Sequence, residues 1–247
     1  DFNGIEFSTS HFQPEQEGGG RTTVSMTYGK SVAKGNVTTS FTVRNNQKIR
    51  SRDRKLTNIN DSFNAPSANY QTGGNFGGNV DNTCAGNESA YVAGDFCRYK
   101  FNDIKDETPD VKQISNITNF SYDLSSNLTL FGTTLASYKD TQNVYAPGVV
   151  ALSVNSAVID GYNLPGHTAG EDVNIFWRSA QLGNRISNSD ERVFGGNVGV
   201  KTYLGDTWEI SAIVGADKSL RENTNPLGYS NKAGLVALME NGTINPF

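Results

Sequence analysis

The sequence predicts an all-β protein, specifically an antiparallel, up-and-down transmembrane β-barrel segment (a partial barrel) with long extracellular loops. Three features predict this class: apolar and polar residues alternate in several segments, short polar turns join neighbouring segments, and two other connections are very long. The composition agrees, because 13 Phe, 10 Tyr and 26 Gly accompany only 2 Met, and aromatic residues are enriched in strands.

Six segments show the period-2 alternation that gives a strand one apolar and one polar face. They are residues 22–29, 37–44, 118–124, 128–137, 196–204 and 208–217. In the fifth, Val198 and Val200 alternate with Asn197 and Lys201. Residues 30–36, 125–127 and 205–207, rich in Gly, Asn, Ser and Asp, are interpreted as turns. We therefore expect three antiparallel hairpins.

The connections between these hairpins, residues 45–115 and 138–193, are much longer than usual for a compact domain, which indicates a function. Short turns at one end and long loops at the other are typical of outer-membrane barrels. The alternative is a soluble β-sandwich in which the same apolar residues face a core. Six strands are too few for a closed barrel, which needs at least about eight. Further strands are therefore expected in the long connections, or the chain, which starts at Asp1 and ends at Phe247 without a closing strand, is a fragment.

In a membrane barrel the apolar side of each strand contacts lipid and the polar side lines the lumen. A strand tilted by about 45° crosses the bilayer with roughly 9–11 residues. Tyr28, Tyr122 and Trp208 lie beside the turns, where an interfacial girdle of aromatic residues is expected. The side chains predicted to face lipid are Val24, Met26, Phe41, Val43, Phe120, Tyr122, Leu130, Val198, Val200, Ile210 and Val214.

Charge and histidine content narrow the functional classes. With 21 Lys+Arg against 25 Asp+Glu, the net charge is −4, which argues against nucleic-acid binding. His11 and His167 are the two histidines, and neither belongs to a nucleophile–base or metal-ligand motif. We therefore expect no enzymatic activity, catalytic residue, metal or cofactor.

A basic run follows the second predicted strand. It has two interpretations, a solvated loop base or a contact with lipopolysaccharide phosphates or another anionic ligand. Its residues are Lys48, Arg50, Arg52, Arg54 and Lys55.

Cys84 and Cys97 are the two cysteines of the chain and lie in a Gly- and Asn-rich region. They lack C-x-x-C spacing and have no histidine nearby, so a structural disulfide is predicted rather than a redox or metal pair. Closing a loop of this size stabilises the fold by roughly 3 kcal/mol in the chain-entropy model. A disulfide also implies an oxidising compartment.

Several stretches resemble the barrel of TonB-dependent outer-membrane receptors. The region from Arg178 to Phe247 contains Gly183-Asn184-Arg185, VFGGNVGVKTYLGDTWEISAIVGADKS and LGYSNKAGLVALMENGTINPF. NFSYDLSSNLTLFGTTLAS is similar to the family's strand–turn–strand unit. NGIEFSTS resembles the end of the plug domain, although it has one glycine and departs from the family at the Asn and Ile positions.

This resemblance implies that residues 1–20 are a candidate plug–barrel junction and that residues 21–247 are the N-terminal, incomplete part of the barrel. It implies a receptor in the outer membrane of a Gram-negative bacterium that takes up a scarce nutrient, such as a siderophore, vitamin or oligosaccharide, with energy from TonB. The implied partners are outer-membrane lipid, the nutrient, and TonB acting through regions absent from this chain.

Three alternatives remain open at this point. The first two are a passive porin and an outer-membrane adhesin, each using the same barrel without a plug. The third is a secreted carbohydrate-binding β protein whose loop aromatics contact the ligand. Those aromatics would be Tyr91, Tyr99, Tyr145, Tyr162 and Trp177.

Overall fold

A computed structural model describes residues 2–57, 61–79, 84, 87–205 and 207–247. The chain forms two compact units. Unit 1 comprises residues 1–48, 109–142 and 188–224, and unit 2 comprises residues 49–108, 143–187 and 225–247. The long connections of the sequence thus belong to a folded unit of their own.

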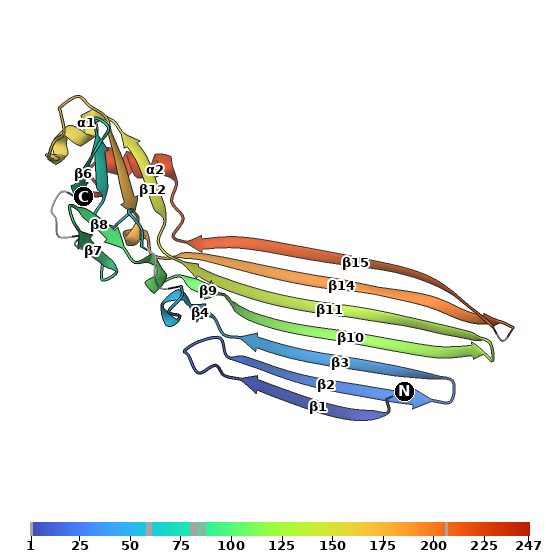
Figure 1. Cartoon of the computed structure of the whole chain (residues 1–247). Coiled ribbons are helices and arrows are strands. Elements are labelled where there is room, and N and C mark those ends of the chain that lie inside the picture. Colours follow the sequence, from blue (N-terminus) through green and yellow to red (C-terminus); the bar gives the residue numbers. More distant parts are fainter. Residues whose placement is uncertain (1, 58–60, 80–83, 85–86, 206) are drawn as a thin grey trace. The chain divides into compact units, whose positions relative to one another are not determined.

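Unit 1 is built on one seven-stranded sheet whose strands lie side by side in chain order (Figure 1). The strands are β1 (Gly4–Phe12), β2 (Arg21–Val32), β3 (Gly35–Asn46), β10 (Asp110–Ser125), β11 (Leu128–Tyr145), β14 (Arg185–Leu204) and β15 (Trp208–Leu227). The last three strands each extend by three residues into unit 2. The prediction of an all-β, antiparallel protein is confirmed.

The predicted hairpins are also confirmed. Strand β2 pairs with β3, and β10 pairs with β11, both antiparallel, while β14 and β15 are neighbours in the sheet. Val32 pairs with Gly35 at one end of the first hairpin, and Arg21 pairs with Asn46 at the other. The short turns therefore join the strands at one end of the sheet, and the long connections leave from the other. The third predicted turn, 205–207, includes Asp206, which lies outside the described residues.

Several strands are longer than the sequence pattern predicts. Strand β10 begins at residue 110 rather than 118, and β14 begins at residue 185 rather than 196. The additional parts are rich in polar residues, some of which make cross-strand contacts. Lys139 Nζ lies 2.7 Å from Glu191 Oε2, and Gln142 donates a hydrogen bond of 3.3 Å to Asn188. In these parts apolar residues such as Ile114 and Val193 share a side of the strand with charged residues, so the alternation gave no clear signal there.

Strand β1 lies within residues 1–20, the candidate plug–barrel junction. Its Phe7 pairs with Met26 of β2, so the segment extends the sheet by one strand. Ile5 and Phe7 alternate with Glu6 and Ser8, a pattern that could have been read as a strand. The junction itself stays a prediction.

The register places the residues predicted to face lipid on one side of the sheet. Val24 pairs with Val43 and Met26 with Phe41, and Tyr122 pairs with Leu130. Leu130, Val198, Val200 and Val214 line one shallow hollow. We call this side the apolar face; it comprises Val24, Met26, Phe41, Val43, Phe120, Tyr122, Leu130, Val198, Val200, Ile210 and Val214.

The opposite side of the sheet, the polar face, carries hydroxyl pairs. Ser25 Oγ lies 3.0 Å from Thr42 Oγ1, and Thr27 Oγ1 lies 2.8 Å from Ser40 Oγ. Both pairs are direct cross-strand neighbours. Side chains of alternate residues point to opposite sides of a strand. This second side is mixed toward β11, because Ile117, a cross-strand partner of Ser40, pairs with Leu135 there.

Within the described ranges, no helix has both the length and the hydropathy needed to cross a membrane.

Unit 2 contains a second antiparallel sheet. Further strands in the long connections were one expectation, but the individual strands were not predicted. Its order is β12 (Val149–Val154), β13 (Val173–Arg178), β5 (Asn69–Thr72) and β6 (Asn75–Asn79). Val150, Leu152 and Val154 of β12 are buried opposite Trp177, Ile175 and Val173 of β13. Helix α1 (Ser156–Ile159) adds Ile159 to this core, and helix α2 (Lys232–Glu240) adds Leu235 and Met239.

Short elements complete unit 2. They are the paired strands β4 (Ile49–Arg50) and β9 (Asp106–Thr108), the hairpin β7 (Ala90–Ala93) and β8 (Phe96–Tyr99), and the 3₁₀ turns η1 (Ser51–Asp53), η2 (Phe101–Asp103), η3 (Asp160–Tyr162) and η4 (Ala180–Leu182).

Tyr99 and Trp177 are fully buried, and the Trp177 indole donates to the Pro66 carbonyl at 2.9 Å. The interpretation of these two aromatics as ligand contacts was therefore wrong; both belong to the core.

Candidate ligand-binding site

The predicted disulfide is present. Cys84 and Cys97 are bonded, with their Cα atoms 5.4 Å apart, inside the range that such a bond allows. Cys97 lies in β8 and is fully buried, as is Tyr99 of the same strand. The bond therefore ties residue 84 to the buried side of the β7–β8 hairpin.

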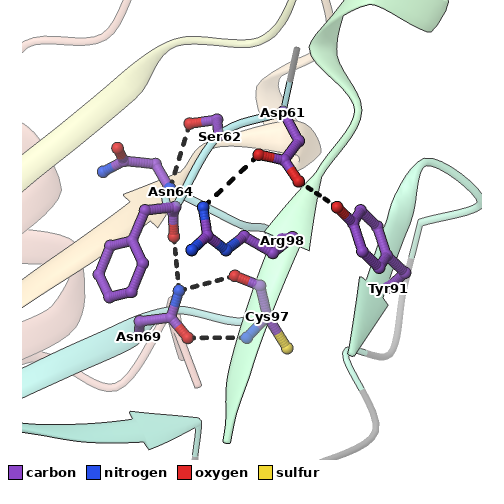
Figure 2. Close-up of polar contacts among 8 residues, drawn as sticks. Asp61, Ser62, Asn64, Asn69, Tyr91, Cys97 and Arg98 are labelled. Carbon is purple, nitrogen blue, oxygen red and sulfur yellow. Dashed lines mark hydrogen bonds and ion pairs between the residues drawn. The ribbon is translucent and has the colours of Figure 1, made fainter. Parts of the chain in front are cut away.

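A buried asparagine holds the same hairpin from its other side (Figure 2). The Cys97 backbone N–H donates to Asn69 Oδ1 at 2.9 Å, and Asn69 Nδ2 donates to the Cys97 carbonyl at 2.8 Å. Asn69 Nδ2 also donates to the Phe63 carbonyl. The amide of a buried asparagine must find partners for its donors and its acceptor, and here those partners connect β5, β8 and the segment around Phe63.

This arrangement places the Asp61 carboxylate beside the Arg98 guanidinium and the Tyr91 hydroxyl. Ser62 and Tyr99 exchange backbone hydrogen bonds of 2.9 and 3.0 Å, so the neighbouring Asp61 lies next to Arg98, whose Nη1 is 3.5 Å from Asp61 Oδ1. Tyr91 is the cross-strand partner of Arg98, and its hydroxyl donates to Asp61 Oδ2. Asp61, Tyr91 and Arg98 are called the Asp61 group below (Figure 2).

The electrostatics of the Asp61 group follow from these contacts. The hydrogen bond to the Asp61 carboxylate raises the pKa of Tyr91, and partial burial adds to that rise. A hydrogen bond from the neutral phenol to a carboxylate favours the protonated phenol. Tyr91 is therefore a fixed hydrogen-bond donor, and its ring lies 5.3 Å from the Lys100 ammonium.

Four phenylalanine rings, called the Phe63 cluster below, pack next to the Asp61 group. The Phe63 ring centroid lies 5.2 Å from Phe76, 5.3 Å from Phe96 and 5.4 Å from Phe176. The Arg98 guanidinium carbon lies 5.8 Å from the Phe63 centroid. Phe76 is 52% exposed, so the cluster reaches the surface beside charged and hydrogen-bonding groups.

Aromatic surface next to a few fixed polar groups is the usual composition of a small-molecule site. Among the residues that the structure describes, no group of three His, Cys, Asp or Glu side chains could hold a metal ion. The arrangement is suited to binding a ligand that has both apolar and polar surfaces. Sequence reasoning had singled out Tyr91 alone, because Asp61, Phe63 and Arg98 lie in a connection without a recognisable motif.

The basic run is partly occupied by local contacts. Arg52 Nε lies 3.6 Å from Asp53 Oδ1, and Arg54 Nη1 donates to the Asp53 carbonyl at 2.9 Å. The Lys48 backbone N–H donates to Asp110 at 2.8 Å. Arg52 and Lys55 are exposed, and their contact with lipopolysaccharide stays a prediction.

The two histidines lie far apart in the sequence and have different environments. His11 Nδ1 lies 2.9 Å from Thr22 Oγ1 on unit 1. His167 Nε2 donates to the Asp160 carboxylate at 2.8 Å in unit 2, and this bond lowers the pKa of Asp160.

No protein-family model, curated protein or solved structure matches this chain at a significant level.

Proposed function

We propose that this chain is part of an outer-membrane β-barrel receptor that takes up a scarce nutrient with energy from TonB. The observation that carries the proposal is the exposure of the apolar face. Val24 is 48% exposed, Phe41 42% and Val214 70%. Monomeric soluble proteins rarely expose contiguous apolar patches beyond a few hundred Å², whereas a barrel wall requires such a surface toward lipid.

The strands are also long enough for this role. Strand β3 has 12 residues, β10 has 16 and β15 has 20, and about 9–11 tilted residues cross the hydrocarbon core. Chain-order neighbours joined by short turns at one end are the connectivity of an up-and-down barrel. The two edge strands of the sheet, β1 and β15, are where further strands would continue the wall.

Three polar side chains on the apolar side satisfy one another. Thr39 and Thr118 are cross-strand partners with their hydroxyl oxygens 2.8 Å apart, and Asn116 Nδ2 donates to Thr39 Oγ1 at 3.0 Å. In hydrocarbon a polar group without a partner costs several kcal/mol. This local satisfaction is therefore compatible with a lipid environment.

Unit 2 favours a receptor over a passive pore. It has its own core and disulfide and carries the Asp61 group and the Phe63 cluster. A pore needs no such site. The TonB and nutrient-uptake parts of the proposal rest on the resemblance of residues 178–247 and of the segment around residues 119–137 to that receptor family.

The wall is tested by labelling single cysteines in membranes. Both native cysteines are in the disulfide, so they do not react. Cysteines at 198, 200, 210 and 214 should resist a water-soluble thiol reagent and be reached by a lipid-phase quencher, while cysteines at 197, 199, 209 and 211 should not contact the quencher. Equal quenching of both sets would contradict a lipid-facing wall, and recovery of the native protein in the soluble fraction would support the secreted alternative.

The receptor function is tested separately in cells. Nutrient-dependent growth or uptake that requires both this protein and TonB would support a receptor. Uptake that persists without TonB would point to a passive porin, and surface attachment without uptake would point to an adhesin.

A further inference from the structure

We propose that Arg185, held by the rings of Tyr145 and Tyr229, binds the carboxylate or phosphate group of a small anionic ligand. This site lies wholly within unit 2 and does not depend on whether the sheet of unit 1 spans a membrane. It is separate from the Asp61 group, where the arginine already has a carboxylate partner.

The Arg185 guanidinium is fixed but largely unused. Its central carbon lies 5.7 Å from the Tyr145 ring centroid and 5.9 Å from that of Tyr229. Its Nε donates to the Ala146 carbonyl at 2.9 Å. In the described part of the chain, its Nη groups have no hydrogen-bond acceptor and no carboxylate oxygen lies within ion-pair distance. Arginine carries five N–H donors, so the four on Nη1 and Nη2 are available to a ligand.

The surrounding backbone and side chains keep this arrangement in place. Gly228 has φ of +75°, and a Cβ there would lie 2.5 Å from the Asn184 carbonyl oxygen and 2.6 Å from the Arg185 nitrogen. The residue before Tyr229 therefore packs directly on the backbone of Arg185. On the other side, Asn143 Nδ2 donates to the Tyr145 hydroxyl at 2.8 Å. A site ordered before binding loses less entropy when its ligand arrives.

A second arginine, Arg178, adds positive charge near Arg185. Arg178 is 3% exposed and donates to the carbonyls of Asn64 at 3.1 Å and Pro147 at 2.8 Å. Among the described residues it has no carboxylate partner. Burial lowers the pKa of Arg178 to about 10, and the nearby charge of Arg185 contributes to that decrease.

Other arginines of unit 2 show the contrast. Arg98 lies beside Asp61 and Arg52 beside Asp53, so each charge is balanced locally. Arg178 and Arg185 instead face carbonyl oxygens and aromatic rings. Two neighbouring arginines without a carboxylate partner create a positive electrostatic potential that favours binding of an anion. The N–H groups of a guanidinium can also donate to two oxygens of a carboxylate or phosphate at once.

The first test is calorimetric titration of the intact, full-length protein with citrate and, separately, with inorganic phosphate. Saturable binding of citrate alone assigns a carboxylate, binding of phosphate alone assigns a phosphate, and binding of both assigns the shared oxyanion chemistry. Arg185→Gln should weaken binding by about tenfold or more, because it removes charge-assisted hydrogen bonds. Arg185→Lys should also weaken it, since the charge remains but the fork is lost.

The matched control is Arg221→Gln, which removes an exposed arginine of unit 1 whose Nε donates to Ser189 at 2.9 Å. It should leave the affinity unchanged. The proposal is overturned if the intact protein binds neither probe saturably, if Arg185→Gln binds as tightly as the parent, or if Arg221→Gln loses as much affinity.

A second test needs no substitution and so avoids any folding defect. The unaltered protein is treated with phenylglyoxal, an arginine-selective reagent, and modification is mapped by mass spectrometry. The bound anion should slow modification of Arg185 and leave that of Arg221, an exposed arginine of unit 1, unchanged. Equal rates at Arg185 with and without a saturating probe would overturn the assignment.

Discussion

The side chain of Asn69 pairs with the peptide groups of Cys97 as a neighbouring strand would. One hydrogen bond runs from the Cys97 N–H to Asn69 Oδ1 at 2.9 Å, and the other runs from Asn69 Nδ2 to the Cys97 carbonyl at 2.8 Å. Both residues are fully buried. Cys97 is therefore held by three connections, which are the disulfide, the Asn69 amide and its pairing with Val92 in the β7–β8 hairpin.

Asn69→Ala should destabilise unit 2 by about 2 kcal/mol or more, because buried backbone donors and acceptors left without partners cost roughly 1–3 kcal/mol each. Denaturant unfolding followed by the fluorescence of Trp177, which is buried in the same unit, measures this loss. Asn174→Ala is the matched control, since Asn174 is exposed on β13, and it should change stability by less than about 0.5 kcal/mol. Equal effects of the two substitutions would contradict the assigned role of Asn69.

Reduction of Cys84–Cys97 should lower the stability of unit 2 by roughly 3 kcal/mol, the value expected for a loop of this length. Unfolding midpoints with and without a thiol reductant measure the change. In Asn69→Ala, reduction should cost more than in the parent protein, because both connections act on Cys97 and are coupled. An unchanged midpoint in reductant would contradict the stabilising role of the disulfide, and strictly additive effects would show that the disulfide and the Asn69 amide act independently of each other.

Much of unit 1 could be predicted from the sequence. Alternation identified the hairpins. Every second residue of a strand lies on the same side of the sheet, and this rule assigned residues such as Val24 and Val43 to the apolar face. The pattern failed where strands become polar on both sides, as in Arg185–Arg192 of β14. In that part the sheet is held by specific pairs such as Lys139 with Glu191, and side-chain pairing of this kind has no periodic signal in the sequence.

Unit 2 was largely missed. The strands of its four-stranded sheet have four to six residues, and β6 reads NFGGN, which resembles a loop. Strand β12 was detectable, because VVALSV is a short, Val-rich apolar run of the kind that forms buried strands. The Asp61 group and the Phe63 cluster could not be predicted, since they depend on Asn69 bringing β5 and β8 together across 28 residues of chain.

Acid should loosen the 160–170 segment of unit 2. The hydrogen bond from His167 lowers the pKa of Asp160 below its ordinary value of 3.8, and the Gly170 N–H helps. A carboxyl group whose pKa is lower in the folded state stabilises the fold above its unfolded pKa, and this contribution is lost as pH falls through the folded pKa. We therefore expect amide hydrogen exchange in residues 160–170 to accelerate below about pH 4.

Asp160→Asn should remove that acceleration, because no carboxylate then titrates at this position. Asp95→Asn, an exposed aspartate at the β7–β8 turn, is the control and should retain it. If exchange in Asp160→Asn still accelerates below pH 4 as in the parent, the His167–Asp160 contact is not the origin of the acid sensitivity.

Substitution by arginine should have different effects on folding at two neighbouring residues of β14. Val200 belongs to the apolar face. If that face contacts the middle of a bilayer, Val200→Arg should reduce the free energy of folding into the membrane by about 2–4 kcal/mol, and the loss should be smaller if residue 200 lies near the bilayer surface. Lys201 belongs to the polar face, where its Nζ lies 3.7 Å from Glu209; exposed pairs contribute little. Lys201→Arg should therefore be nearly silent. The fraction of protein that folds into lipid vesicles, measured by the mobility of unheated samples in a denaturing gel, reports both effects.

The comparison also discriminates between environments: Val200 is 38% exposed, so a face bathed in water would accept Arg at position 200 almost as readily as at position 201. Similar folding of the two variants would thus contradict a lipid-facing wall, and a selective loss for Val200→Arg would support it.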